Sequence, residues 1–263
     1  MKRRKFIQST VIASAVASVL PFSNVTSQEL PFIGSVSEKE LYELRTYELR
    51  FGGNKKLLID YLDRVFQPAL KRIGVNHFMI FEELDNSNPT KLRVLISYPN
   101  TSVYLSAQNL YSDLEYVKEA KKYNSLTPDQ AIYNRYNSSL LLAFDGMPKL
   151  IDSVKGASLF ELRTYEGFSE DAVKRKIKMF NKEEIQLFLK TNLHPVFFGE
   201  MIAGPYRPCL TYMLNFKDME EHDSSWKDFI NHPEWKVMST KEEYANTVSN
   251  IRKVFLKPIR SER

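Results

Sequence analysis

The chain has 263 residues, of which 43% are hydrophobic and 13% aromatic, so it can bury a substantial core. Its formal net charge of +5 comes largely from the first 27 residues, which hold four basic residues and no acidic one; the remainder carries 33 basic against 32 acidic residues. This charge balance gives no electrostatic support for nucleic-acid binding. The single cysteine, Cys209, excludes an internal disulfide. No segment after residue 27 is apolar for long enough to span a membrane.

Residues 1–27 have the pattern of an export signal. The basic stretch Lys2–Lys5 precedes an apolar run at 11–20 that is too short for a transmembrane helix. The paired arginines, followed two residues later by Phe6, resemble a Tat signal, which predicts export to the bacterial periplasm and cleavage before Gln28. A disordered basic N-terminus is the alternative. Residues 28–40 are expected to form an irregular leader.

Residues 41–145 predict a unit with the order β-α-β-β-α-β. Alternation of apolar and polar residues predicts strands, whereas apolar residues at helical spacing predict helices, the first of them kinked by Pro68 and ended by Gly74. Asp85–Pro89 has the composition of a hairpin turn. The elements expected, in chain order, are a strand at 41–50, a helix at 55–72, strands at 77–84 and 92–98, a helix at 103–117 and a strand at 139–144.

Residues 158–258 repeat this unit after a linker at 146–157. Leu41–Glu48 returns as Leu159–Glu166 with one aromatic exchange, and the offset of 118 residues also relates Glu82 to Glu200, so the chain contains an internal duplication. The elements expected here are a strand at 158–166, a helix at 170–191, strands at 196–203 and 209–216, a helical region at 219–244 interrupted by Pro233, and a strand at 247–257.

The predicted fold is therefore α+β, with two tandem ferredoxin-like units. Each such sheet carries helices on one face only and leaves its other face to be covered. Two sheets in one chain can cover each other, which predicts an intrachain pseudo-dimeric α+β barrel.

Several separated motifs resemble the NIPSNAP domain. They are the Leu-x-Glu-Leu-Arg-Thr-Tyr-Glu sequence that opens each unit, Pro68 with Arg72-x-Gly74, the stretch 138–150 and His232-Pro233-Glu234-Trp235. The resemblance implies a dimeric α+β barrel, the fold of a wider superfamily that includes small monooxygenases and haem-binding enzymes. It implies no assigned catalytic residues. Because the motifs differ between the two copies, we expect the copies to contribute unequally to any site.

Charged and aromatic residues alternate along the first strand of each unit. Glu43, Arg45 and Tyr47 share one face of the strand, and so do Glu161, Arg163 and Tyr165. If these faces point into the barrel, six polar groups converge in a cavity where arginine could hold a carboxylate and tyrosine could donate a hydrogen bond. The alternative, which we prefer, is that the Glu–Arg pairs are structural ion pairs.

Two further pairs of residues occupy corresponding strands. Glu82 and Glu200 could act as general bases, although a role as partners for nearby arginines is the simpler interpretation. His77 and His194 begin equivalent strands and could bind haem, but a solvated or capping histidine is the simpler interpretation. No histidine pair has the spacing of a zinc site, so no metal is predicted.

Several enzyme classes lack sequence support, because the chain has no phosphate-binding loop, Walker motif, Gly-x-Ser-x-Gly or CxxC. The preferred function is small-ligand binding in or near the barrel between the repeats, with no cofactor predicted. Alternatives are a cofactor-free or haem-dependent oxidoreductase of the wider superfamily, and an interaction module that forms homo-oligomers through a sheet edge.

Overall fold

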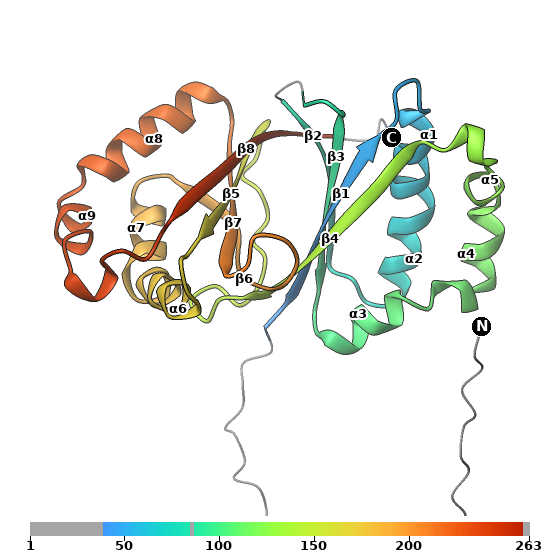
Figure 1. Ribbon diagram of the computed structural model, residues 1–263. Coiled ribbons are helices and arrows are strands. Elements are labelled where there is room, and N and C mark those ends of the chain that lie inside the picture. The colour runs from blue at the N-terminus through green and yellow to red at the C-terminus, as the bar shows by residue number, and fades with distance from the viewer. Residues whose placement is uncertain (1–38, 85–86, 260–263) are drawn as a thin grey trace, which may run out of the picture. The chain divides into compact units, whose positions relative to one another are not determined.

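The computed structural model describes residues 39–84 and 87–259. Within them, two βαββαβ units join edge to edge, and their eight strands close into one barrel in the order β1-β3-β2-β8-β5-β7-β6-β4. The helices of each half lie on the outside of its own four strands (Figure 1). The predicted α+β pseudo-dimeric barrel is thus confirmed. The predicted signal peptide, residues 1–27, lies outside the described residues.

The first half follows the predicted order of strands, although its helical segments are broken. Its elements are β1 (Leu41–Leu49), α1 (Lys55–Tyr61), η1 (Leu62–Phe66), α2 (Gln67–Arg72), β2 (His77–Glu83), β3 (Lys91–Tyr98), α3 (Thr101–Ala107), η2 (Leu110–Ser112), α4 (Leu114–Glu119), α5 (Lys121–Asn124), η3 (Pro128–Gln130) and β4 (Tyr133–Ala143).

The second half repeats this arrangement. Its elements are β5 (Leu159–Glu166), α6 (Glu170–Met179), η4 (Phe180–Glu184), α7 (Ile185–Lys190), β6 (His194–Ala203), β7 (Cys209–Phe216), α8 (Met219–Asn231), α9 (Pro233–Met238), η5 (Glu242–Tyr244) and β8 (Asn250–Pro258).

A π-helical turn interrupts the first helical segment of each half. These turns, η1 and η4, lie at the same 118-residue offset as the strand motif. In the first half Pro68 follows the π turn, but Gln186 stands at the corresponding position in the second half. The π turn is therefore a duplicated feature of this helical segment, and proline is not required for it.

Two predicted boundaries in the first half are wrong. The helix expected at 103–117 is broken after Ala107, and a new helix starts at Leu114 because the Asp113 carboxylate accepts the backbone N–H groups of Glu115 and Tyr116. The last strand begins at Tyr133 rather than at 139. Residues 134–138 of this strand are exposed and mostly polar, so they show no apolar alternation that would mark a strand.

The buried side chains of residues 39–84 and 87–259 form three apolar cores. One fills the barrel and contains Tyr42 and Leu44 of β1 together with Phe160 and Leu162 of β5. The other two lie outside the barrel, each between one half's strands and its own helices. Each fully buried side chain of this size stabilises the fold by roughly 1.5–3 kcal/mol. Since the inner faces of both sheets are apolar, each half covers the surface that the other would otherwise expose.

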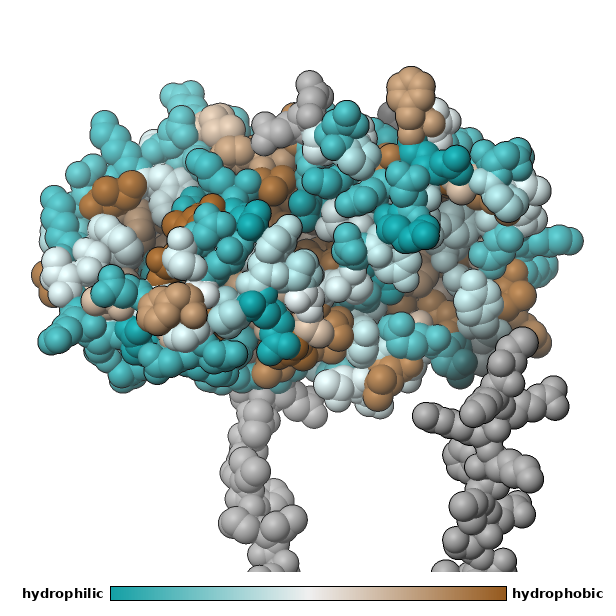
Figure 2. Space-filling model, viewed as in Figure 1, coloured by the Kyte–Doolittle hydropathy of each residue, from teal (hydrophilic) through white to brown (hydrophobic). Residues whose placement is uncertain are grey.

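The face of the molecule that Figure 2 shows is mostly polar. In the view of Figure 2, hydrophilic residues cover most of this face and hydrophobic ones are scattered among them. No helix among the described residues is both long and apolar enough to cross a membrane.

Candidate functional site

The six polar strand residues do not converge in the barrel, so that prediction is wrong. Tyr42 and Leu44 fill the interior, and strand alternation therefore turns Glu43, Arg45 and Tyr47 outward, toward the helices of the first half. Glu161, Arg163 and Tyr165 turn outward in the same way, toward the helices of the second half. The protein therefore has two separate polar clusters on opposite sides of the barrel.

Glu43 and Arg45 form a buried ion pair in the first half. Arg45 Nε and Nη2 donate to the two carboxylate oxygens of Glu43 at 2.7 and 3.1 Å. Tyr98 and Ser138 donate their hydroxyls to the same carboxylate at 2.8 and 2.5 Å. Burial by itself would raise the pKa of Glu43, but Arg45 and these hydrogen bonds hold it below its ordinary value. The preferred prediction of a structural ion pair fits this geometry.

Arg45 also borders a cavity of about 220 Å³ between the sheet and the helices of the first half. The guanidinium lies 4.9 Å from the ring centre of Phe66 and 5.6 Å from that of Tyr136. Gln108 lines the cavity at the end of α3. Most of the remaining wall is tyrosine, contributed by β1, β4 and several helical segments: Tyr47, Tyr61, Tyr111, Tyr116, Tyr123, Tyr133 and Tyr136.

Hydrogen bonds and ring contacts hold these tyrosines in place. The hydroxyls of Tyr61 and Tyr116 are 2.7 Å apart, and Tyr123 donates to Tyr133 at 3.2 Å. The rings of Tyr61 and Tyr123 are stacked with their centres 3.8 Å apart. Burial raises the pKa of Tyr47 to about 12 although Arg45 acts to lower it, so this phenol is neutral at ordinary pH. The cavity thus offers flat ring faces and neutral hydroxyl groups beside one guanidinium.

The corresponding position in the second half is filled. Arg163 donates to Glu161 at 2.8 Å, and Trp226 donates its indole N–H to the same carboxylate at 2.9 Å. The Trp226 ring covers Arg163, with 4.4 Å between guanidinium carbon and ring centre. At the 118-residue offset, Trp226 corresponds to Gln108. The two copies therefore differ beside this arginine, with a cavity in the first half and a tryptophan ring in the second.

Glu82 and Glu200 lie away from this cavity. Each forms an ion pair with a lysine of the first helix in its own half, Lys55 for Glu82 and Lys174 for Glu200. The expectation that they are paired thus fits, but the partners are lysines and not the expected arginines. Both carboxylates are partly exposed.

The two predicted histidines also lie outside the cavity. His77 is 3.5 Å from Asp152, and His194 is 3.8 Å from Glu221. The spacing between His77 and His194 is one residue shorter than the 118-residue offset of the repeat. The cause is a β-bulge in β6, between Pro195 and Phe197. Neither histidine lines the cavity at Arg45.

The residues of the cavity do not fit a haem. Its volume of about 220 Å³ is below the range of pockets for drug-sized ligands, so it is too small for a haem. Within ranges 39–84 and 87–259, no three His, Cys, Asp or Glu side chains are grouped as metal ligands. Cys209 is buried 3.5 Å from the sulfur of Met201, and burial raises the pKa of its thiol to about 11.

Sequence reasoning identified Arg45 and Tyr47 but missed the helical tyrosines. A signal was present, because seven tyrosines occur between residues 98 and 136. Most of them lie on short helical segments whose breaks disturb the helical period. Their convergence depends on how these segments pack over β1 and β4.

Comparison with known proteins agrees with this architecture. Residues 160–262 match the model of the NIPSNAP family. A candidate monooxygenase from Lactobacillus acidophilus NCFM is 12% identical with a TM-score of 0.56, and the alignment covers 84% of this chain and 94% of that one. A second candidate monooxygenase, from Fusobacterium nucleatum subsp. nucleatum ATCC 25586, is 11% identical with the same TM-score, covering 85% and 94%.

A NIPSNAP-like domain protein from Burkholderia xenovorans is 15% identical over 40% of this chain and 87% of its own, with a TM-score of 0.36. No curated protein gave a match. At these identities the structural matches show the fold alone. Residues 160–262 are thus similar to the NIPSNAP family, and the two halves together have the fold of a dimeric α+β barrel.

Proposed function

We propose that the protein binds a small planar aromatic molecule in the cavity at Arg45. The observation that carries this proposal is the difference between the halves: Trp226 covers the arginine of the second half, whereas the first half leaves a tyrosine-lined cavity beside its arginine. The proposed site lies outside the barrel, within one repeat, whereas the sequence suggested a site in or near the barrel between the repeats.

The lining supports this class of ligand. Tyrosine faces favour a flat ring, and such ring pairs contribute about 0.5–1.5 kcal/mol beyond the area that they bury. Arg45 and Tyr47 provide hydrogen-bond donors for an oxygen of the ligand. Because Glu43 already neutralises Arg45, the ligand requires an acceptor oxygen but not a negative charge.

The sharpest test is Gln108→Trp, because it gives the first half a tryptophan at the position where Trp226 covers the arginine of the second half. The probe is 2-naphthol, whose fluorescence reports its environment, with naphthalene as the matched molecule that lacks oxygen. The wild type is expected to bind 2-naphthol, and Gln108→Trp is expected to weaken binding by about tenfold or more, since a difference of about 1.4 kcal/mol corresponds to that factor.

Leu105→Trp is the control, because Leu105 lies on the same helix but is exposed and does not line the cavity. It should bind the probe like the wild type. Equal binding by the wild type and Gln108→Trp would contradict the proposal. The natural ligand can be identified separately, by mass spectrometry of the small molecules released from protein purified from its native host.

A second candidate function is cofactor-free oxidation of such a ligand. The fold likeness to two candidate monooxygenases over 94% of their length favours it. Dioxygen consumption with 2-naphthol, lost in Gln108→Trp and retained in Leu105→Trp, would support an oxidoreductase. Binding of 2-naphthol without oxygen consumption would support a protein that binds the aromatic molecule but does not oxidise it.

We further propose export to the bacterial periplasm by the Tat-like signal. Paired arginines at positions 3 and 4 followed by Phe6 support this route. Replacing both arginines by lysine is expected to retain the protein in the cytoplasm. Normal export of that variant would indicate the general secretory route instead.

A further inference from the structure

Two tyrosine rings of the first half are stacked on each other beside the cavity at Arg45. Tyr61 ends α1 and Tyr123 belongs to α5, and these helices lie side by side on the outside of the sheet (Figure 1). The ring centres are 3.8 Å apart and the ring planes differ by 3°. Aromatic pairs usually have their centres about 4.5–7 Å apart in offset or edge-to-face arrangements, so this pair is both closer and more parallel than usual.

No other tyrosine pair in residues 39–84 and 87–259 has this geometry. In the remaining contacts between tyrosine rings, the centres are at least 5.0 Å apart. Tyr165 and Tyr212 of the second half share a hydrogen bond of 2.9 Å, but their rings meet edge to face with 5.4 Å between centres. The pair in the first half therefore places ring carbons of one phenol over those of the other.

The repeated fold does not require tyrosine at either position. At the 118-residue offset, Met179 takes the place of Tyr61 and Lys241 takes the place of Tyr123. Met179 is buried, and Lys241 forms an ion pair with Glu183. The stacked phenols are thus a feature of the first half alone.

Contacts between tyrosines connect Tyr61 to the surface. The hydroxyls of Tyr61 and Tyr116 are 2.7 Å apart, and the Tyr116 ring contacts that of Tyr111 with 5.7 Å between centres. Tyr111 is 67% exposed. Because phenols in contact can exchange an electron, an oxidant at the surface can reach Tyr61 without entering the cavity.

Tyr123 is connected to the surface in the same way. It donates its hydroxyl to Tyr133 at 3.2 Å, and the Tyr133 ring contacts that of the exposed Tyr136. Burial raises the pKa of both Tyr61 and Tyr123, so both phenols are protonated at ordinary pH. Each phenol must therefore lose its proton together with an electron, and each has another hydroxyl oxygen within hydrogen-bond distance.

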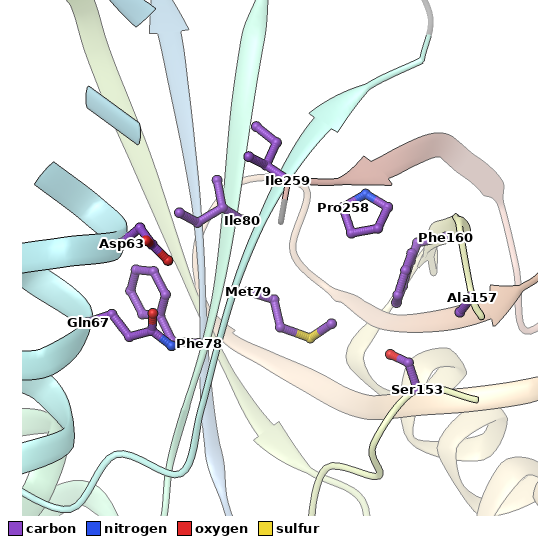
Figure 3. Close-up of a pocket in the computed structure, with 10 residues that line it drawn as sticks. All are labelled: Asp63, Gln67, Phe78, Met79, Ile80, Ser153, Ala157, Phe160, Pro258 and Ile259. Carbon is purple, nitrogen blue, oxygen red and sulfur yellow. The ribbon is translucent and has the colours of Figure 1, made fainter. Parts of the chain in front are cut away.

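A cavity of about 310 Å³ elsewhere in the protein has a different lining. It lies where the barrel wall is incomplete among the described residues, because β2 and β8 pair only from Phe81 to Glu83. Its aromatic residues are Phe78 and Phe160, and no tyrosine lines it (Figure 3). Phenylalanine has no phenolic hydrogen and is much harder to oxidise. The oxidisable rings are thus gathered at the cavity beside Arg45 and not at this one.

We infer that Tyr61 and Tyr123 form an oxidative cross-linking site. Each phenol gives one electron to a one-electron oxidant and its phenolic proton to water, which leaves two neutral phenoxyl radicals. The radicals form one carbon–carbon bond between the ring positions next to the hydroxyls, and the hydrogens on these two carbons move to the phenoxyl oxygens. In total two electrons and two protons leave, and the product is a dityrosine that links α1 to α5.

Photochemical oxidation of the full chain tests this inference. The oxidant is ruthenium(III) tris(bipyridine), generated by light and persulfate in a dilute solution of the protein. The expected product is a monomer with dityrosine fluorescence, in which mass spectrometry finds the peptides of Tyr61 and Tyr123 joined with the loss of two hydrogen atoms. Tyr165 and Tyr212, whose rings do not stack, should remain unlinked.

Two variants of the first half form a matched pair. Tyr123→Phe keeps the aromatic ring but removes the phenol, so the link should be lost. Tyr104→Phe is the control, because the Tyr104 ring contacts Tyr98 edge to face and does not touch the stacked pair. This variant should form the link like the wild type. Absence of the link in the wild type, an unchanged dityrosine signal in Tyr123→Phe, or links formed only between molecules would overturn the inference.

Thermal unfolding provides a second measurement. A covalent link between residues far apart in the sequence restricts the unfolded chain, so the oxidised wild type should unfold at a higher temperature than the untreated protein. Oxidised Tyr123→Phe should show no such rise. A linked protein with a lower midpoint than the untreated one would mean that the rings leave their folded positions in order to couple, which would contradict the inference.

Discussion

At the scale of single residues, the Glu–Arg pair of each half is the clearest stabilising feature. The side chains of Glu43 and Glu161 are 4% and 0% exposed, and those of their arginines are 11% and 15% exposed. Removing one partner of such a pair leaves an uncompensated buried charge, which costs more than the intact pair contributes.

Arg45→Ala and Arg163→Ala are each expected to lower the free energy of unfolding by about 3–5 kcal/mol, because the buried Glu43 or Glu161 then loses its arginine. Urea denaturation measures the change. Lys56→Ala serves as the control, since Lys56 is 80% exposed and pairs only with Asp60 on the surface. Midpoints equal to that of the wild type would show that these pairs are not stabilising.

His222 gives the second half a distinct dependence on pH. Burial would lower its pKa, but the nearby carboxylates of Glu161 and Asp223 raise it above its ordinary value. The charged form therefore stabilises the fold, fully so below about pH 6.5, and this contribution is lost as the pH rises through the raised pKa. We expect the free energy of unfolding of the wild type to fall above about pH 6.5 relative to that of His222→Gln. Parallel pH profiles for the two proteins would contradict this assignment.

At the scale of elements, the first helical segments of the two halves share a π turn but bury different residues beside it. The second half buries an ion pair, with Lys176 Nζ 2.6 Å from a carboxylate oxygen of Glu184. The first half has Leu58 and Phe66 at the corresponding positions. Burial raises the pKa of Glu184 even though Lys176 acts to lower it. The same backbone thus accommodates either an ionic or an apolar pair.

Lys176→Leu should destabilise the protein by about 3–5 kcal/mol, because Glu184 remains buried without its partner. Adding Glu184→Phe reproduces the apolar pair of the first half and is expected to recover most of this loss. Thermal and urea denaturation of the single and double variants provide the measurement. A double variant no more stable than the single one would show that the two halves cannot exchange these residues.

At the scale of the whole molecule, the two sheets depend on each other. Their inner faces carry residues such as Tyr42 and Phe160, which are fully or almost fully buried only because the barrel is closed. A half-molecule would expose this apolar face to water.

Separate expression of residues 37–149 and 150–263 tests this dependence. Each piece alone is expected to aggregate or to self-associate, and co-expressed pieces are expected to purify together as one complex. Size-exclusion chromatography distinguishes these outcomes. Two soluble, folded monomers would show that closure of the barrel is not required for folding.

Much of the architecture could be predicted from the sequence, because the duplication is visible in the repeated Leu-x-Glu-Leu-Arg-Thr-Tyr-Glu motif and strand alternation is a local property. The direction in which Glu43 and Arg45 point could not be predicted. Both faces of β1 are buried, one by the opposite sheet and one by helices, so alternation separates the faces but does not identify them.

The cavity at Arg45 could not be predicted from the sequence for a related reason. Its tyrosines come from β1, β4 and several short helical segments, and no local pattern specifies how these pack together. The sequence by itself determined the repeat, the order of elements and the pairing of Glu with Arg, because these depend on neighbours along the chain. Only the tertiary structure decided which half is open and where the barrel wall is incomplete, because both depend on contacts between residues far apart in the sequence.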